Sequence, residues 1–144
     1  MGWFSKNDKS DIVNQPKDMS PLEAITHLCA AIQLADGQTN YEEKEPWLNT
    51  IKELFPDFSE NRAERFLMDA QTIINKKVGN EKINYVIDVS VRIRSLLNDD
   101  QIKTLAPKIA NIIEADGMVM TSETDIAKVI EDQLGINIAI NENL

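Results

Sequence analysis

Hydrophobic residues recur at three- and four-residue spacing through most of this chain, a pattern that predicts amphipathic α-helices. The clearest helix start is Ser20-Pro21-Leu22-Glu23. It places serine at the N-cap, proline at the first helical position and glutamate three residues after the cap. The spacing of the apolar residues predicts a helix from there to Asp36, with this inward stripe: Leu22, Ile25, Leu28, Cys29 and Ile32.

Two further helices are expected in the first half of the chain. The second covers about residues 41–55, and Pro46 either kinks it or begins its regular part, because proline is tolerated only in the first turn. The third runs from about Glu60 to Lys77, with Ser59 as its cap and Gly79 as its stop. The side chains expected to face inward from these two helices are Trp47, Leu48, Ile51, Leu54, Phe55, Ala63, Phe66, Leu67, Ala70, Ile73 and Ile74.

The segment from Ile83 to Leu97 fits two periodicities. β-branched residues alternate with polar ones between Tyr85 and Arg94, as in a strand. The same segment also places apolar residues at helical spacing. We predict a helix, because a strand needs a partner and no second strand pattern lies nearby.

Two more helices complete the pattern. One opens at Asp99 or Asp100 and reaches Asp116, and we expect Pro107 to split or kink it. The last spans about residues 122–134, and Gly135 followed by Ile136 predicts a Schellman stop. The chain is therefore predicted to be all-α, with six to seven helices in one compact domain at residues 20–136, between a flexible arm at 1–19 and a tail at 137–144.

One motif, Ala-Asp-Gly-x5-Glu, occurs twice, 80 residues apart. Each copy follows an apolar helical run, so Gly37 and Gly117 are expected to end helices in the left-handed conformation. Asp36 and Asp116 would then stand at helix C-termini, where the helix dipole disfavours negative charge. Each copy is expected to form a helix-turn-helix unit, and the two units are expected to pack about an approximate two-fold axis.

If the two units pack face to face, their carboxylates could converge on a divalent cation. Oxygen ligands favour a hard cation such as Ca²⁺ or Mg²⁺. A true EF-hand is excluded, because its first and third ligand positions would be Ile32 and Leu34. The alternative is that the aspartates cap turns and the glutamates cap helices. The candidate metal ligands are Asp36, Glu43, Asp116 and Glu123, with Glu42, Glu114 and Asp125 as additional candidates.

Composition and charge exclude several classes of function. The 144 residues include 24 acidic and 15 basic side chains, a net charge of −9 that argues against a nucleic-acid partner. No apolar run approaches the length of a membrane span, and no secretory signal is expected. Cys29 is expected in the core, and His27 at the surface or hydrogen-bonded. The sequence contains no nucleophile elbow, phosphate-binding loop, zinc-ligand pair or dinucleotide fingerprint, so we expect no enzymatic activity. The enzymatic alternative would be a magnesium-dependent hydrolase, because acidic pairs can hold Mg²⁺ for phosphoryl chemistry.

The paired motif resembles that of the tellurite-resistance TerB-like family. The residues that carry the resemblance are Ala35, Asp36, Gly37, Glu42, Glu43, Ala115, Asp116, Gly117, Val119, Glu123 and the closing Leu134-Gly135-Ile136. The resemblance covers about residues 20–136, and departs from the family at Thr39, Pro46 and Met120. It implies an all-helical bacterial stress-response module that binds divalent cations and works with partners in the cytoplasm, at the inner face of the membrane.

Two functions remain open at this point. The first is a TerB-like module that binds protein partners under the control of a divalent cation such as Ca²⁺. The second is a metal-independent interaction domain, like the helical part of a J-domain co-chaperone; this chain lacks the His-Pro-Asp of a J-domain, since Leu28 follows its only histidine. Trp3 and Phe4 in the arm are expected to dock on the domain itself, on a partner or on a bilayer.

Overall fold

The computed structural model describes residues 15–34, 45–114 and 121–138. These residues form helices and connections, with no strand among them, so the predicted all-α class is confirmed. The helical interpretation of residues 83–97 is also confirmed. The elements are η2 (Pro16–Asp18), α1 (Pro21–Gln33), α2 (Glu45–Leu54), α3 (Glu60–Asn75), α4 (Asn80–Leu96), α5 (Asp99–Glu114) and α6 (Thr121–Leu134).

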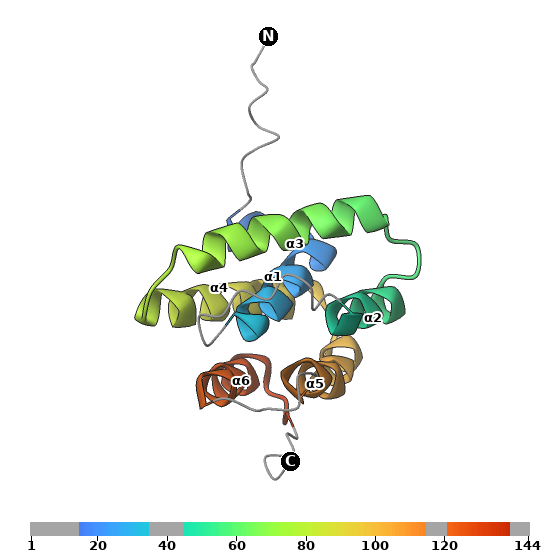
Figure 1. Cartoon of the computed structure of the whole chain (residues 1–144). Helices are drawn as coiled ribbons and strands as arrows, with labels where there is room; N and C mark the ends of the chain where they lie inside the picture. The colour runs from blue at the N-terminus through green and yellow to red at the C-terminus, as the bar shows by residue number, and fades with distance from the viewer. Residues whose placement is uncertain (1–14, 35–44, 115–120, 139–144) are drawn as a thin grey trace.

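Helix α1 is the centre of the fold. It packs against each of the other five α-helices, with α3 on one side and the α5–α6 pair on the other (Figure 1). All ten residues from Glu23 to Ile32 are buried. The prediction of an amphipathic helix here is therefore wrong, since α1 has no solvent face. The sequence carries a matching signal, because no charged residue lies between Glu23 and Asp36.

Two predicted helix caps are confirmed. The Ser20 hydroxyl accepts from the Glu23 backbone N–H at 3.2 Å, and the Glu23 carboxylate accepts from the Ser20 N–H at 3.4 Å, which is a complete capping box. Ser59 accepts from the N–H three residues further on. Helix α5 is also capped by a reciprocal pair, between Asn98 and Gln101 at 2.8 and 2.9 Å. Helix α5 begins at Asp99, as predicted, and Asn98 is its cap.

The two glycines with positive φ have different roles. Gly135 has φ +68°, and the Ile136 N–H donates to the Glu131 carbonyl at 3.3 Å, which confirms the Schellman stop of α6. Gly79 was predicted to end α3, and this prediction is wrong. Helix α3 ends at Asn75, and Gly79, with φ +54° and ψ −126°, is the N-cap of α4. Both backbones need glycine, one to leave a helix and one to enter it.

Neither proline breaks its helix. Pro107 was expected to split or kink its helix; α5 continues over Pro107, so the split is wrong, and the kink stays a prediction. The proline lacks the N–H that would bond the Lys103 carbonyl, and both residues are exposed, so water can take that carbonyl. Helix α2 begins at Glu45, which places Pro46 in the first turn, where no intrahelical donor is needed. Residues 41–44 lie outside the described residues, so the choice between a kink at Pro46 and a helix start there stays a prediction.

Packing continues slightly past the boundaries drawn from the sequence. Helix η2 packs against α4, and the Met19 side chain that follows it is fully buried. At the other end, Ile138 is buried and its N–H donates to the Glu131 carboxylate at 2.6 Å. These contacts tie residues of the expected arm and tail to the core.

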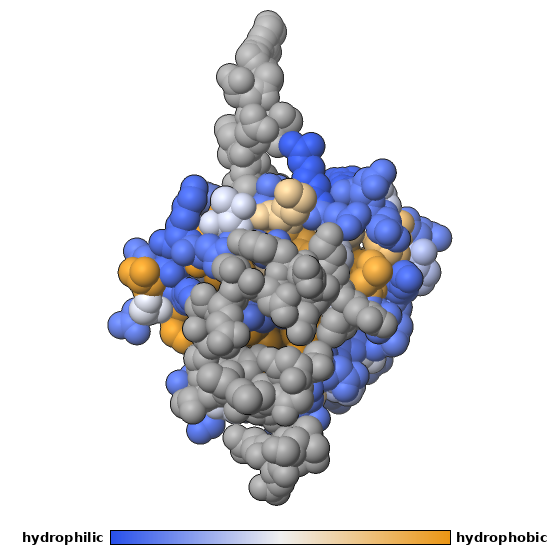
Figure 2. All heavy atoms as spheres, in the orientation of Figure 1, coloured by the Kyte–Doolittle hydropathy of each residue, from blue (hydrophilic) through white to orange (hydrophobic). Residues whose placement is uncertain are grey.

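Hydrophilic side chains cover most of the described surface in the view of Figure 2, with small apolar spots between them. Among the described residues, the exposed large hydrophobic side chains are Met68 of α3, Val78 of the α3–α4 connection and Val91 of α4. None of the helices in the described ranges is long and apolar enough to cross a bilayer.

Candidate functional site

The two motif copies begin where described helices end. Helix α1 ends at Gln33, and its C-cap Leu34 precedes the first Ala-Asp-Gly segment; α5 is described to Glu114, the residue before the second. Glu123 is the third residue of α6, although its side chain is outside the described set. The other motif residues lie outside the described residues altogether: Asp36, Gly37, Glu42, Glu43, Asp116 and Gly117.

Two of the additional candidate ligands can be placed. Glu114 is the half-buried last residue of α5, and Asp125 is exposed on α6. Within the described ranges, no group of three or more histidine, cysteine or acidic side chains could hold a metal ion. The convergence of four motif carboxylates on a cation therefore stays a prediction.

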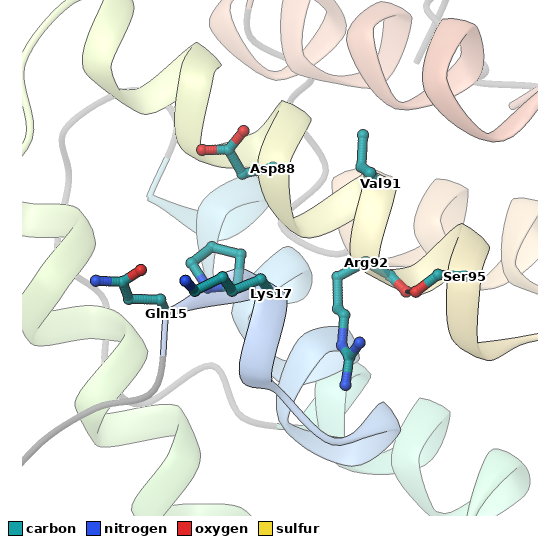
Figure 3. A pocket seen from close by; sticks show the side chains of 7 residues that line it. Gln15, Lys17, Asp88, Val91, Arg92 and Ser95 are labelled. Carbon is teal, nitrogen blue, oxygen red and sulfur yellow. Dashed lines mark hydrogen bonds between the residues drawn. The ribbon is translucent and has the colours of Figure 1, made fainter.

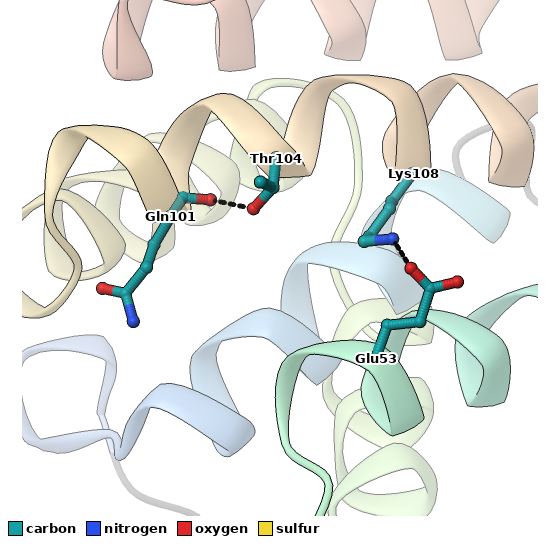
Figure 4. A network of polar contacts seen from close by, with 4 residues as sticks. All are labelled: Glu53, Gln101, Thr104 and Lys108. Atoms are coloured by element: carbon teal, nitrogen blue, oxygen red, sulfur yellow. Dashed lines mark hydrogen bonds and ion pairs between the residues drawn. The ribbon is translucent and has the colours of Figure 1, made fainter.

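The helices that flank the motifs are in contact. Helix α1 packs against α5 and α6, and α2 packs against α5. An ion pair between Glu53 of α2 and Lys108 of α5 joins the two helix pairs at the surface (Figure 4). The pair is partly exposed, so it adds at most about 1 kcal/mol to stability. The pairs α1–α2 and α5–α6 are thus neighbours, while the two-fold relation between them remains a prediction.

A lysine from a distant helix reaches the end of α1. The Lys82 ammonium of α4 donates to the Leu34 carbonyl at 3.2 Å, in a partly buried contact. Leu34 is the C-cap of α1 and stands two residues before Asp36. A cation at this position offsets the negative end of the helix dipole. The first motif therefore follows a helix end that the protein itself supplies with a positive charge.

The interior of α1 carries a polar centre that links three helices. His27 is fully buried, and its Nδ1 lies 2.6 Å from the Tyr85 hydroxyl of α4. The buried Trp47 of α2 donates its indole N–H to the Thr26 hydroxyl at 3.2 Å. His27 was predicted to be at the surface or hydrogen-bonded; it is hydrogen-bonded and not at the surface. These bonds fix the rotation of α1 against both neighbours, because buried polar groups must keep their partners.

Burial shifts the ionisation of this centre. It lowers the pKa of His27 to about 4, so the ring is neutral at neutral pH. It also raises the pKa of the Tyr85 phenol, and the Glu23 carboxylate raises it further. The Nε2 atom of His27 and the hydroxyl of Ser90 have no partner among the described residues. Burial raises the pKa of the Cys29 thiol to about 12, which leaves this core cysteine unreactive.

A pocket of about 420 Å³ lies between η2 and α4 (Figure 3). Its volume is within the range of small-ligand sites. Lys17 and Asp88 bring opposite charges to its rim, and Arg92 reaches from α4 toward η2. The complete lining is Gln15, Pro16, Lys17, Asp88, Val91, Arg92 and Ser95.

No protein-family model, curated protein or solved structure matches this chain. The site must therefore be argued from its own residues.

Sequence reasoning did not identify Lys82, Tyr85 or Arg92. Each acts through a contact with a residue at least 48 positions away along the chain. No local spacing encodes such a contact. The one available signal was the charge-free run after Glu23, which indicates a helix enclosed on every side and hence a buried histidine.

Proposed function

We propose that this protein is a non-enzymatic, TerB-like stress-response module of the kind associated with tellurite resistance. It acts in the cytoplasm, at the inner face of the membrane, by binding protein partners. A divalent cation, Ca²⁺ in the first instance, controls this binding through Asp36, Glu43, Asp116 and Glu123. The further candidate ligands are Glu42 in the first copy and Glu114 and Asp125 close in sequence to the second.

The observation that supports the proposal is the packing of the two helices that precede the motifs in sequence. One copy follows Leu34, the C-cap of α1, and the other follows Glu114 of α5 in sequence, and these two helices pack against each other. A repeated acidic motif at the ends of two packed helices is an arrangement in which both copies can serve one site. Uncompensated carboxylates at helix C-termini are unfavourable, so a bound cation would relieve the repulsion.

A second candidate is favoured by Lys82. Its ammonium bonds the Leu34 carbonyl, so the helix end that precedes the first motif already has a positive charge. This arrangement favours a metal-independent helical interaction domain, like that of a J-domain co-chaperone, in which the aspartates serve as turn caps.

Thermal melts with and without a chelator separate the two candidates. Millimolar Ca²⁺ or Mg²⁺ should raise the melting temperature of the parent. At a hundredfold excess of cation over Kd, the free energy of unfolding should rise by about 2.7 kcal/mol. The double substitution Asp36→Asn with Asp116→Asn should abolish the rise and cost little stability in chelator. The matched control, Asp57→Asn with Asp132→Asn, changes two exposed aspartates outside the motifs and should keep the rise.

Absence of any metal response in the parent, together with a loss of stability in the motif variant, would support the metal-independent candidate instead. A metal response that survives in the motif variant would place the cation elsewhere and overturn the assignment of ligands.

A further inference from the structure

We propose that the pocket between η2 and α4 is the surface on which this protein binds a partner, and that its occupant is a peptide segment in which acidic residues flank an apolar one. The inference rests on the proposed function as a partner-binding module and names the surface and the chemistry of the partner.

The walls of the pocket are held in place before any ligand arrives. The buried Met19 side chain anchors the end of η2 in the core. The Arg92 Nε–H donates to the Met19 carbonyl at 2.8 Å, which fastens η2 to α4. The Ser95 hydroxyl donates to the Arg92 carbonyl at 2.6 Å, so its lone pairs remain available to accept a bond from a ligand. A preformed site avoids part of the ordering cost of binding.

The charges of the pocket select an acidic ligand. Among the described residues, no ion pair involves Lys17, Asp88 or Arg92. Two cationic side chains and one anionic side chain give the lining a net charge of about +1, in a protein whose net charge is −9. The lining is therefore opposite in sign to the molecule as a whole, which favours approach of an acidic segment at this place.

The apolar lining residues explain why the ligand should carry an apolar side chain. Val91 is 53% exposed, although it belongs to a helix whose other large apolar side chains are buried or half-buried. Val91 and Pro16 supply the apolar part of the pocket lining, beside the cationic Lys17 and Arg92 and the anionic Asp88. An apolar side chain of a partner would cover Val91, while flanking carboxylates pair with Lys17 and Arg92. The Gln15 amide is available to bond the backbone of an extended peptide.

The test uses the full chain, labelled with ¹⁵N, and the capped pentapeptide Gly-Glu-Leu-Glu-Gly. Millimolar peptide should shift the amide signals of η2 and of the second half of α4. Lys17→Glu should weaken binding by about three- to tenfold, and Asp88→Lys should strengthen it by a similar factor, as expected for partly exposed charge pairs. Val91→Ser should also weaken it, and the capped peptides Gly-Lys-Leu-Lys-Gly and Gly-Glu-Ser-Glu-Gly should bind more weakly than the parent peptide.

Matched controls carry the same charge changes outside the pocket, at the exposed Lys103 (Lys103→Glu) and Asp57 (Asp57→Lys). These controls should leave the affinity unchanged. Equal effects in pocket and control variants, or peptide shifts confined to other elements, would overturn the proposal. The readout does not depend on metal. If the peptide does not bind but the melts show a metal response, only the proposed peptide surface is refuted. If the peptide binds but the melts show no metal response, the peptide surface stands and the metal-controlled function is refuted.

Discussion

His27 should make the stability of this protein depend on pH in a window set by its burial. The ring is fully buried in α1 and bonded to Tyr85, and its pKa in the folded state is about 4, against an ordinary value of 6.5. The unfolded chain therefore binds a proton at a higher pH than the folded chain does. The contribution of the neutral ring is complete above pH 6.5 and is lost as the pH falls toward 4.

The magnitude follows from the shift. A difference of one pKa unit corresponds to 1.36 kcal/mol, so the shift from 6.5 to about 4 implies a loss of about 3 kcal/mol across the window. This is a large fraction of the stability of an ordinary domain. Carboxylates also titrate at the lower end of this range, so the contribution of the histidine must be isolated by comparison with a variant.

Urea unfolding of the parent and of His27→Gln, followed by tryptophan fluorescence at several pH values from 7.5 to 4, makes that comparison. Glutamine does not titrate and can still bond the Tyr85 hydroxyl. The parent should lose about 3 kcal/mol more than the variant between pH 7 and pH 4. Parallel pH profiles for the two proteins would refute the reasoning.

A second measurement needs no substitution. The chain has a single histidine, so its imidazole carbon-bound protons can be followed by NMR without assignment of other rings. In the folded protein they should not titrate near pH 6.5. A titration centred there would show that the ring is open to solvent.

Two further predictions concern the helix ends, each checked by urea unfolding at neutral pH. Gly135→Ala should cost about 1 kcal/mol, because φ is +68°, whereas Gly135→Asn should cost less; nothing lies within 4 Å of an added Cβ, so a clash cannot contribute, and equal costs would contradict the left-handed stop. Ser20→Ala should also cost about 1 kcal/mol through loss of the capping box, while Ser20→Asp should cost less. Unchanged stability in Ser20→Ala would show that the cap does not stabilise α1.

The sequence by itself determined the local elements of this protein. Helical periodicity, the serines at positions 20 and 59 and the stop at Gly135 depend on residues within a few positions of one another, so they could be read directly. The position of Cys29 in the core followed from the same periodicity. Errors arose where two local signals competed, as at Gly79, which can leave one helix or enter the next.

Only the tertiary structure decided which faces are enclosed and which distant residues meet. Helix α1 is buried on every side because five helices pack around it, and this burial, not the local sequence, makes His27 neutral and requires Tyr85 as its partner. The contact of Lys82 with the end of α1 and the pocket beside Arg92 arise in the same way. A side chain's exposure and charge state depend on all of its neighbours in space, and spacing along one helix specifies only those on that helix.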